Sequence, residues 1–144
     1  DNVINRAELL KILSVVVDAD FGGKVLAECF TDVKDQWFAP YVCYAKESGW
    51  VNGYADGSYK PGDNATRAGA VKIVMEALDY PVCDSMGQDP YNDVTMGDWF
   101  APYACAAKRD QIVSSTSEFD PTGVMTRAQF AQILYNVMSK KGLI

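Results

Sequence analysis

The chain has 144 residues, of which 49% are hydrophobic, and its formal net charge is −6. This size and apolar content suit one globular domain with a real core, and no apolar run approaches the ~20 residues of a membrane-spanning helix. The acidic balance argues against nucleic acid as a partner. Because histidine is absent, the chain lacks the commonest general base and the commonest transition-metal ligand.

The first predicted element is a helix over residues 5–17. Asn5 is a good N-cap residue, and Glu8 stands three positions later, as in a capping box. The same start recurs at Thr66 and Thr126 and predicts helices over 66–79 and 126–139. Apolar residues then follow at helical spacing in all three segments: Leu9, Ile12, Leu13 and Val16; Ala70, Ile73, Val74 and Ala77; Phe130, Ile133, Leu134 and Val137.

A second kind of helix follows a tryptophan. The run from Trp37 to Cys43 returns about 60 residues later as the run from Trp99 to Cys105. Pro40 and Pro102 suit a first helical turn, so helices are expected near 40–48 and 101–110. The two tryptophans lead apolar helix faces, and the core is therefore their expected place.

A turn-rich loop over residues 49–63 separates the two helices of the first full unit. Trp50, Tyr54 and Tyr59 lie on this loop, where exposure and stacking against a ligand are expected. Calcium is a less favoured alternative for the loop, since the spacing is not that of an EF-hand. Its oxygen ligands would be Asp56, Ser58, Asp63 and Asn64.

The four cysteines favour one disulfide in each repeat, Cys29–Cys43 and Cys83–Cys105. Each bridge would stabilise the fold by roughly 3 kcal/mol in the chain-entropy model. Two other connectivities stay open, as does the alternative of four buried free thiols in a cytosolic protein.

Together these elements predict an all-α array of helix–loop–helix units in one domain over residues 1–144. Full repeats are expected at 28–79 and 89–140, and a partial repeat, the last helix of a preceding unit, at 1–20. Repeats of this kind bury their apolar faces against their neighbours.

The order of motifs resembles the S-layer homology family, and the resemblance covers residues 4–140. In the first full unit it is carried by Phe30-Thr31-Asp32-Val33, Trp37, Gly49-Trp50-Val51-Asn52-Gly53, Asp56-Gly57-Ser58-Tyr59-Lys60-Pro61 and Thr66-Arg67-Ala68. In the second it is carried by Tyr91-Asn92-Asp93-Val94, Trp99, Phe119-Asp120-Pro121 and Thr126-Arg127-Ala128. The resemblance implies a pseudo-threefold helical bundle and an extracellular binding module. The residues themselves argue against an enzyme, because the sequence offers no nucleophile with a partner base and no phosphate-binding loop, and no cofactor or metal is expected.

The resemblance also implies binding to secondary cell-wall polysaccharide, acidic or pyruvylated, through grooves between repeats. By position the ligand-binding arginines would be Arg6, Arg67 and Arg127, because a guanidinium holds a carboxylate in two parallel hydrogen bonds. Arg67, aided by Trp50 and Tyr54, is expected to hold the best groove. Asp32 is also a candidate for the site. As an alternative, Asp32 and its counterpart Asp93 would form ion pairs or caps within the fold, and the arginines would then have a purely structural role.

A structural alternative is self-assembly. The first predicted helix lacks a partner within its own repeat, so a second copy could cover its apolar stripe. A head-to-tail contact of this kind does not close and would build an extracellular filament or lattice.

Overall fold

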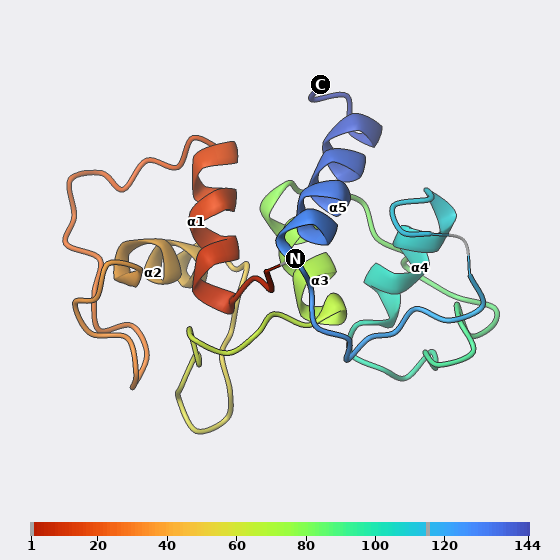
Figure 1. Ribbon diagram of the computed structural model, residues 1–144, viewed down its shortest axis with the longest axis horizontal. Helices are drawn as coiled ribbons and strands as arrows, with labels where there is room; N and C mark the ends of the chain where they lie inside the picture. The colour runs from red at the N-terminus through yellow and green to blue at the C-terminus, as the bar shows by residue number, and fades with distance from the viewer. Residues whose placement is uncertain (1, 115) are drawn as a thin grey trace. The chain divides into compact units, whose positions relative to one another are not determined.

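A computed structural model describes residues 2–114 and 116–144, which form five α-helices and no β-strand (Figure 1). The helices are α1 (Arg6–Val16), α2 (Ala39–Glu47), α3 (Arg67–Ala77), α4 (Ala101–Arg109) and α5 (Arg127–Lys140). Every boundary lies within two residues of the predicted one. The all-α prediction is confirmed.

The helix starts follow from local hydrogen bonds. The Asn5 side chain accepts a bond from the Glu8 N–H (2.8 Å), and the Glu8 carboxylate accepts one from the Asn5 N–H (2.9 Å). Thr126 and Gln129 repeat this capping box at α5. At α3 the Thr66 hydroxyl accepts from the N–H at position 69 (3.2 Å), but the glycine there has no side chain to return the bond.

The chain divides into two compact units. The first, Ile4–Ala65, holds α1 and α2 and is called here the α1–α2 unit; the second, residues 2–3 with Thr66–Ile144, holds α3, α4 and α5 and is called the α3–α5 unit. In the first unit α1 packs on α2, and in the second α3 packs on both α4 and α5. The assembly of the repeats into one pseudo-threefold domain stays a prediction.

The apolar stripe of α1 is not left uncovered. Leu9 and Leu13 are fully buried in the α1–α2 unit, while Ile12 and Val16 are partly exposed. The covering helix, α2, opens the following repeat. The expectation of an unpartnered stripe is therefore wrong, because the first helix of one repeat covers the last helix of the repeat before it.

Both disulfides have the pairing favoured by the repeat. Cys29 is bonded to Cys43 and Cys83 to Cys105, with Cα–Cα distances of 5.5 Å and 6.1 Å. Each bridge ties the segment before an aromatic-x-Asp-Val turn to the helix that follows it, α2 or α4. None of the four cysteines is free.

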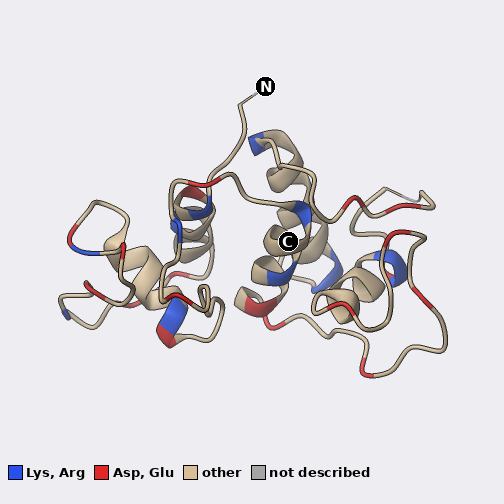
Figure 2. Ribbon diagram, turned by 90° about the horizontal axis from the view of Figure 1, so that it is seen from below, with Lys and Arg blue, Asp and Glu red and all other residues tan. Residues whose placement is uncertain are grey.

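Charge is unevenly distributed along the chain. Nine of the 13 lysines and arginines lie in the five helices, against three of the 19 acidic residues. Figure 2 shows the acidic residues mainly on the connecting loops. Local positive sites are thus built on the helices although the whole chain is acidic. None of the described helices reaches the length and hydropathy of a membrane span.

Candidate functional site

The three arginines of the candidate site occupy one position in three helices. Arg6, Arg67 and Arg127 are the first residues of α1, α3 and α5. A helix N-terminus favours negative charge through its dipole and its free N–H groups. Whether a ligand can use those groups depends on what already accepts from them.

In this chain main-chain carbonyls already occupy the first N–H groups. The Arg6 N–H donates to the Asp63 carbonyl (2.9 Å), and the Arg67 N–H donates to the Gly123 carbonyl at the same distance. The alanine after each arginine donates to Pro61 or Pro121 (3.0 Å each). Only the guanidinium groups remain to meet an anion at α1 and α3.

The third start, at α5, repeats the first of these bonds. The Arg127 N–H donates to the Asn2 carbonyl (2.9 Å), and Asn2 precedes its N-cap residue by three positions, as Asp63 and Gly123 precede theirs. The Arg127 side chain is exposed. One local geometry is therefore built three times.

Asp32 holds the loop that carries the site. Its two carboxylate oxygens accept from the N–H groups of Tyr59 (2.9 Å) and Lys60 (2.8 Å). Asp93 does the same for Phe119 and Asp120 (2.8 Å each). The expected pairing of these aspartates with the arginines is wrong, because both oxygens are committed to main-chain N–H groups of a tight turn.

Arg6 lies among two tyrosines and a lysine, here called the Arg6 cluster (Arg6, Tyr54, Tyr59 and Lys60). Its guanidinium carbon is 4.3 Å from the centre of the Tyr59 ring and 5.2 Å from that of Tyr54. Nε donates to the Tyr59 carbonyl (3.0 Å). Lys60 Nζ lies 4.4 Å from the Tyr54 ring, so an exposed aromatic ring has two cations beside it.

Arg67 is the equivalent arginine of the next repeat, and its main-chain N–H bonds the equivalent loop at Gly123. Arg67 and the two loop residues Phe119 and Asp120 are here called the Arg67 cluster. Phe119 stands where the first unit has Tyr59, and Asp120 stands where it has Lys60. The Asp120 carboxylate lies against Gly123, with no room for a Cβ there. Arg67 Nε is buried and has no hydrogen-bond partner in the described structure.

The protein's own carboxylates do not neutralise these two arginines. Within residues 2–114 and 116–144, neither Arg6 nor Arg67 forms an ion pair. Burial raises the pKa of Tyr59 far above its usual range, so its hydroxyl stays neutral and donates to the Arg6 carbonyl (3.0 Å). The Arg6 cluster therefore presents net positive charge.

The structure corrects the predicted exposure of several aromatic residues. Trp50 is only 6% exposed and packs edge-on against Tyr44, and Tyr59 is fully buried. Trp37 and Trp99, expected in the core, are 56% and 63% exposed. They precede the N-terminus of a helix, where its apolar face has not begun.

Tyr54 is the one loop aromatic that lies where it was expected, with 44% exposure. It contacts Arg6, not Arg67 with which it was predicted to act. Lys60 was missed entirely. Its signal was available in the sequence, since the two repeats carry opposite charges at this position.

The calcium alternative finds no support in the loop. Asp56 accepts from the Ser58 N–H (3.0 Å) and hydroxyl (2.7 Å), and the bond from the hydroxyl is the main cause that lowers the pKa of Asp56. A single carboxylate oxygen, Oδ1, accepts both bonds and thus braces a turn. Among the described residues no group of three or more acidic or cysteine side chains is placed to hold a metal ion.

Comparison with known proteins agrees with the repeat seen here. The sequence model described as "S-layer homology domain" matches residues 30–70 and 90–131. These segments contain α2 with the start of α3, and α4 with the start of α5. Each therefore runs from an aromatic-x-Asp-Val turn into an arginine-bearing helix.

Three relatives illustrate where similar chains occur. The S-layer protein sap of Bacillus anthracis is 30% identical over 107 residues, which are 73% of this chain and 13% of that protein. The middle cell wall protein of Brevibacillus brevis is 28% identical over 141 residues (96% and 12%). Exoglucanase XynX of Acetivibrio thermocellus is 29% identical over 149 residues (95% and 13%). The chain thus matches a small part of much longer proteins.

Proposed function

Because the chain belongs to the S-layer homology domain family, we propose that it binds an acidic polysaccharide of the bacterial cell wall and anchors a surface protein there. The family is one of binding modules, and its occurrence in surface-layer and cell-wall proteins locates the chain at the cell surface. The proposal makes the Arg6 cluster the main binding site.

The observation that carries the proposal is the pair of cations beside an exposed ring. Arg6 and Lys60 both contact Tyr54, and Arg6 has no ion-pair partner in the described structure. Arg6 uses Nε for its bond to the Tyr59 carbonyl. A carboxylate on an acidic or pyruvylated sugar would accept hydrogen bonds from its two Nη groups. Tyr54 offers an apolar face on which a sugar ring can stack.

The Arg67 cluster supports weaker binding. It supplies one arginine, but Asp120 brings a negative charge to the position that Lys60 holds in the first unit. The Asp120 carboxylate repels an acidic ligand, and the repulsion is strongest at low ionic strength. Arg67 is therefore the secondary site in this proposal, and the exposed Arg127 the third.

Retention by purified, immobilised wall polysaccharide tests the proposal. Arg6→Gln is expected to lower affinity about tenfold or more, as the loss of a charge-assisted hydrogen bond worth ~1.5–3 kcal/mol requires. Arg67→Gln, the matched variant in the other unit, should lower it less. Unchanged retention of Arg6→Gln, or equal binding to polymer stripped of its acidic groups, contradicts the proposal.

A further inference from the structure

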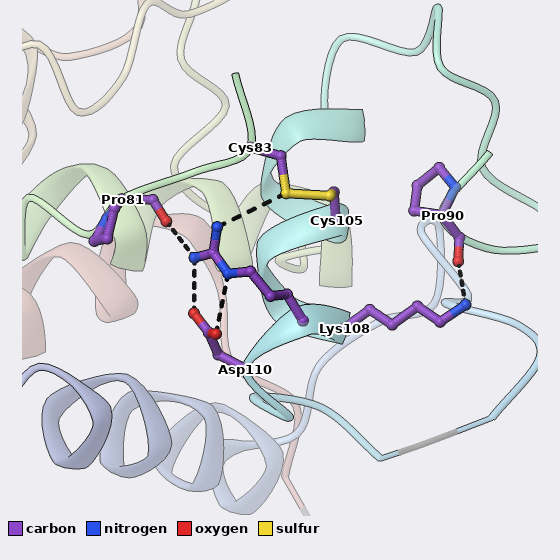
Figure 3. The surroundings of a disulfide bond; sticks show 7 residues. Pro81, Cys83, Pro90, Cys105, Lys108 and Asp110 are labelled. Carbon is purple, nitrogen blue, oxygen red and sulfur yellow. Dashed lines mark hydrogen bonds and ion pairs between the residues drawn. A yellow bond between two sulfur atoms is a disulfide. The ribbon is translucent and has the colours of Figure 1, made fainter. Parts of the chain in front are cut away.

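The two disulfides differ in the charge beside them. Arg109 stands one helical turn after Cys105 on α4, and its Nη1 lies 3.9 Å from the Cys83 sulfur (Figure 3). Asp110 accepts from Arg109 Nε (3.0 Å) and Nη2 (2.7 Å), and the Pro81 carbonyl accepts from Nη2 (2.8 Å). These bonds hold the guanidinium in place, and its remaining nitrogen faces the sulfur.

Cys105, the other cysteine of this bridge, lines a cavity. A volume of about 380 Å³ is lined by residues 85–88, Pro90, Cys105, Lys108 and Arg109. Lys108 bonds the Pro90 carbonyl at its edge (2.8 Å). A small molecule that enters this cavity meets Cys105, while Cys83 lies beside Arg109.

We propose that Cys105 is a thiol-exchange site for low-molecular-weight thiols. A thiolate attacks the Cys105 sulfur, a new disulfide forms between the two, and the Cys83–Cys105 bond breaks. The electron pair of that bond leaves on Cys83 as a thiolate, so the incoming sulfur is oxidised and Cys83 is reduced. Arg109 stabilises the departing thiolate, which makes Cys83 the better leaving group.

The first disulfide provides a comparison within the same chain. Glu47 stands four residues after Cys43, where the second repeat has Arg109 after Cys105. A carboxylate at this position disfavours a thiolate. Cys43 is also only 3% exposed, so a thiol reaches it poorly. Attack on the partly exposed Cys29 would release Cys43 as the thiolate, and Glu47 occupies the position that Arg109 has in the second repeat. Cys29–Cys43 is therefore the resistant bridge and Cys83–Cys105 the exchangeable one.

The lengths of the loops that the two disulfides close weakly favour the opposite ranking of the bridges. The exchangeable bridge spans 22 residues and the resistant one 14, and a longer closed loop stabilises a disulfide more. Because this effect grows only with the logarithm of loop length, access and charge decide the rate. Exchange unties the segment between α3 and α4 and leaves the α1–α2 unit cross-linked.

Partial exchange with 2-mercaptoethanol tests the proposal on the folded protein. After an acid quench and alkylation, peptide mass spectrometry should find the mercaptoethanol adduct on Cys105 and the alkyl group on Cys83, at least about fivefold sooner than any label on Cys29 or Cys43. Equal opening of both bridges, or an adduct mainly on Cys83, overturns the proposal.

Two neighbouring variants separate the charge effect from a change in folding. Arg109→Gln should slow opening severalfold. Asp110→Asn keeps an amide oxygen that can accept from Arg109, beside the bond to the Pro81 carbonyl, but removes the negative charge next to the guanidinium, and should speed opening. Glu47→Gln is the control in the first repeat and should leave the second bridge unchanged. If both Arg109→Gln and Asp110→Asn speed opening, loosening of the fold explains the result and the proposal fails.

Discussion

Two reciprocal hydrogen bonds join Arg6 and Tyr59. Arg6 Nε donates to the Tyr59 carbonyl, and the Tyr59 hydroxyl donates to the Arg6 carbonyl, both at 3.0 Å. The guanidinium lies over the tyrosine ring between these two bonds. The pair thus orients a cation and fastens the turn-rich loop to the start of α1.

Removal of one of these bonds tests their contribution. Tyr59→Phe leaves the ring under Arg6 but takes away the hydroxyl, and the free energy of unfolding should fall by about 1 kcal/mol. Urea unfolding would measure the change. Phe119, the natural residue at the equivalent position, indicates that the variant folds. No loss of stability would mean that the hydroxyl bond contributes nothing net.

Asp32 and Asp93, which brace the loops, should contribute more to the free energy of unfolding than the Tyr59 hydroxyl does. Asp32→Asn keeps the shape of the side chain, but an amide offers one acceptor where two N–H groups, those of Tyr59 and Lys60, need one each. We expect a loss of about 1–3 kcal/mol, because a main-chain donor is left without its partner. Asp93→Asn should cost a similar amount through Phe119 and Asp120. Full stability of both variants would contradict the bracing role.

An exchange of charge between the two repeats tests which site dominates. Lys60→Asp should weaken binding to acidic wall polysaccharide, and Asp120→Lys should strengthen it, each by about tenfold at low salt. The effect should shrink as salt is raised. Titration calorimetry at two salt concentrations would measure it. If neither substitution changed the affinity, Lys60 would not belong to the binding site.

Two glycines in the same loop should respond very differently to alanine. Both have positive φ, 77° at Gly53 and 82° at Gly49, so both variants lose roughly 1–2 kcal/mol to backbone strain. At Gly53 a Cβ would also lie 2.8 Å from the Ser58 carbonyl oxygen and closer still to the Phe30 ring, whereas at Gly49 the space is open. Gly53→Ala should therefore be clearly the less stable variant in thermal unfolding, and similar losses would refute the packing argument.

Tyr80 should make stability sensitive to alkali. Burial, and then the hydrogen bond that Tyr80 donates to Asp110 (2.6 Å), raise its pKa from 10.0 to about 12. The raised pKa favours the folded state fully below pH 10, and this contribution is lost as the pH rises from 10 to 12. Tyr80→Phe should lose less stability across that window, as urea unfolding at pH 9 and 11 would report. An identical loss in both proteins would assign the alkaline sensitivity to other groups.

The helices and the disulfide pattern could be predicted from local signals. Asn5 and Thr126 begin capping boxes, Pro40 and Pro102 suit first turns, and these features act over a few residues. The cysteine pairing followed from the repeat, since equivalent residues adopt equivalent positions. These local signals carried over into the structure because each side-chain helix cap is completed by a residue three positions away.

The site was harder to predict because it depends on contacts between distant segments. Asp32 and Tyr59 are 27 residues apart, and Arg6 and Tyr59 are 53 apart. Residue type suggested that Asp32 pairs with an arginine and that Trp50 is exposed. Only the path of the loop brings two main-chain N–H groups to the Asp32 carboxylate and packs the Trp50 indole against Tyr44.

The sequence by itself determined the repeat, the helix starts and the position of one arginine at the head of three helices, because capping and helical periodicity are local. Only the tertiary structure decided that Arg6 and Lys60 both lie against the ring of Tyr54, and that Asp120 takes the position of Lys60 in the second repeat. The electrostatic surroundings of a side chain depend on which residues, remote in sequence, the backbone brings close to it. Local helix and turn propensities carry no information on these long-range contacts.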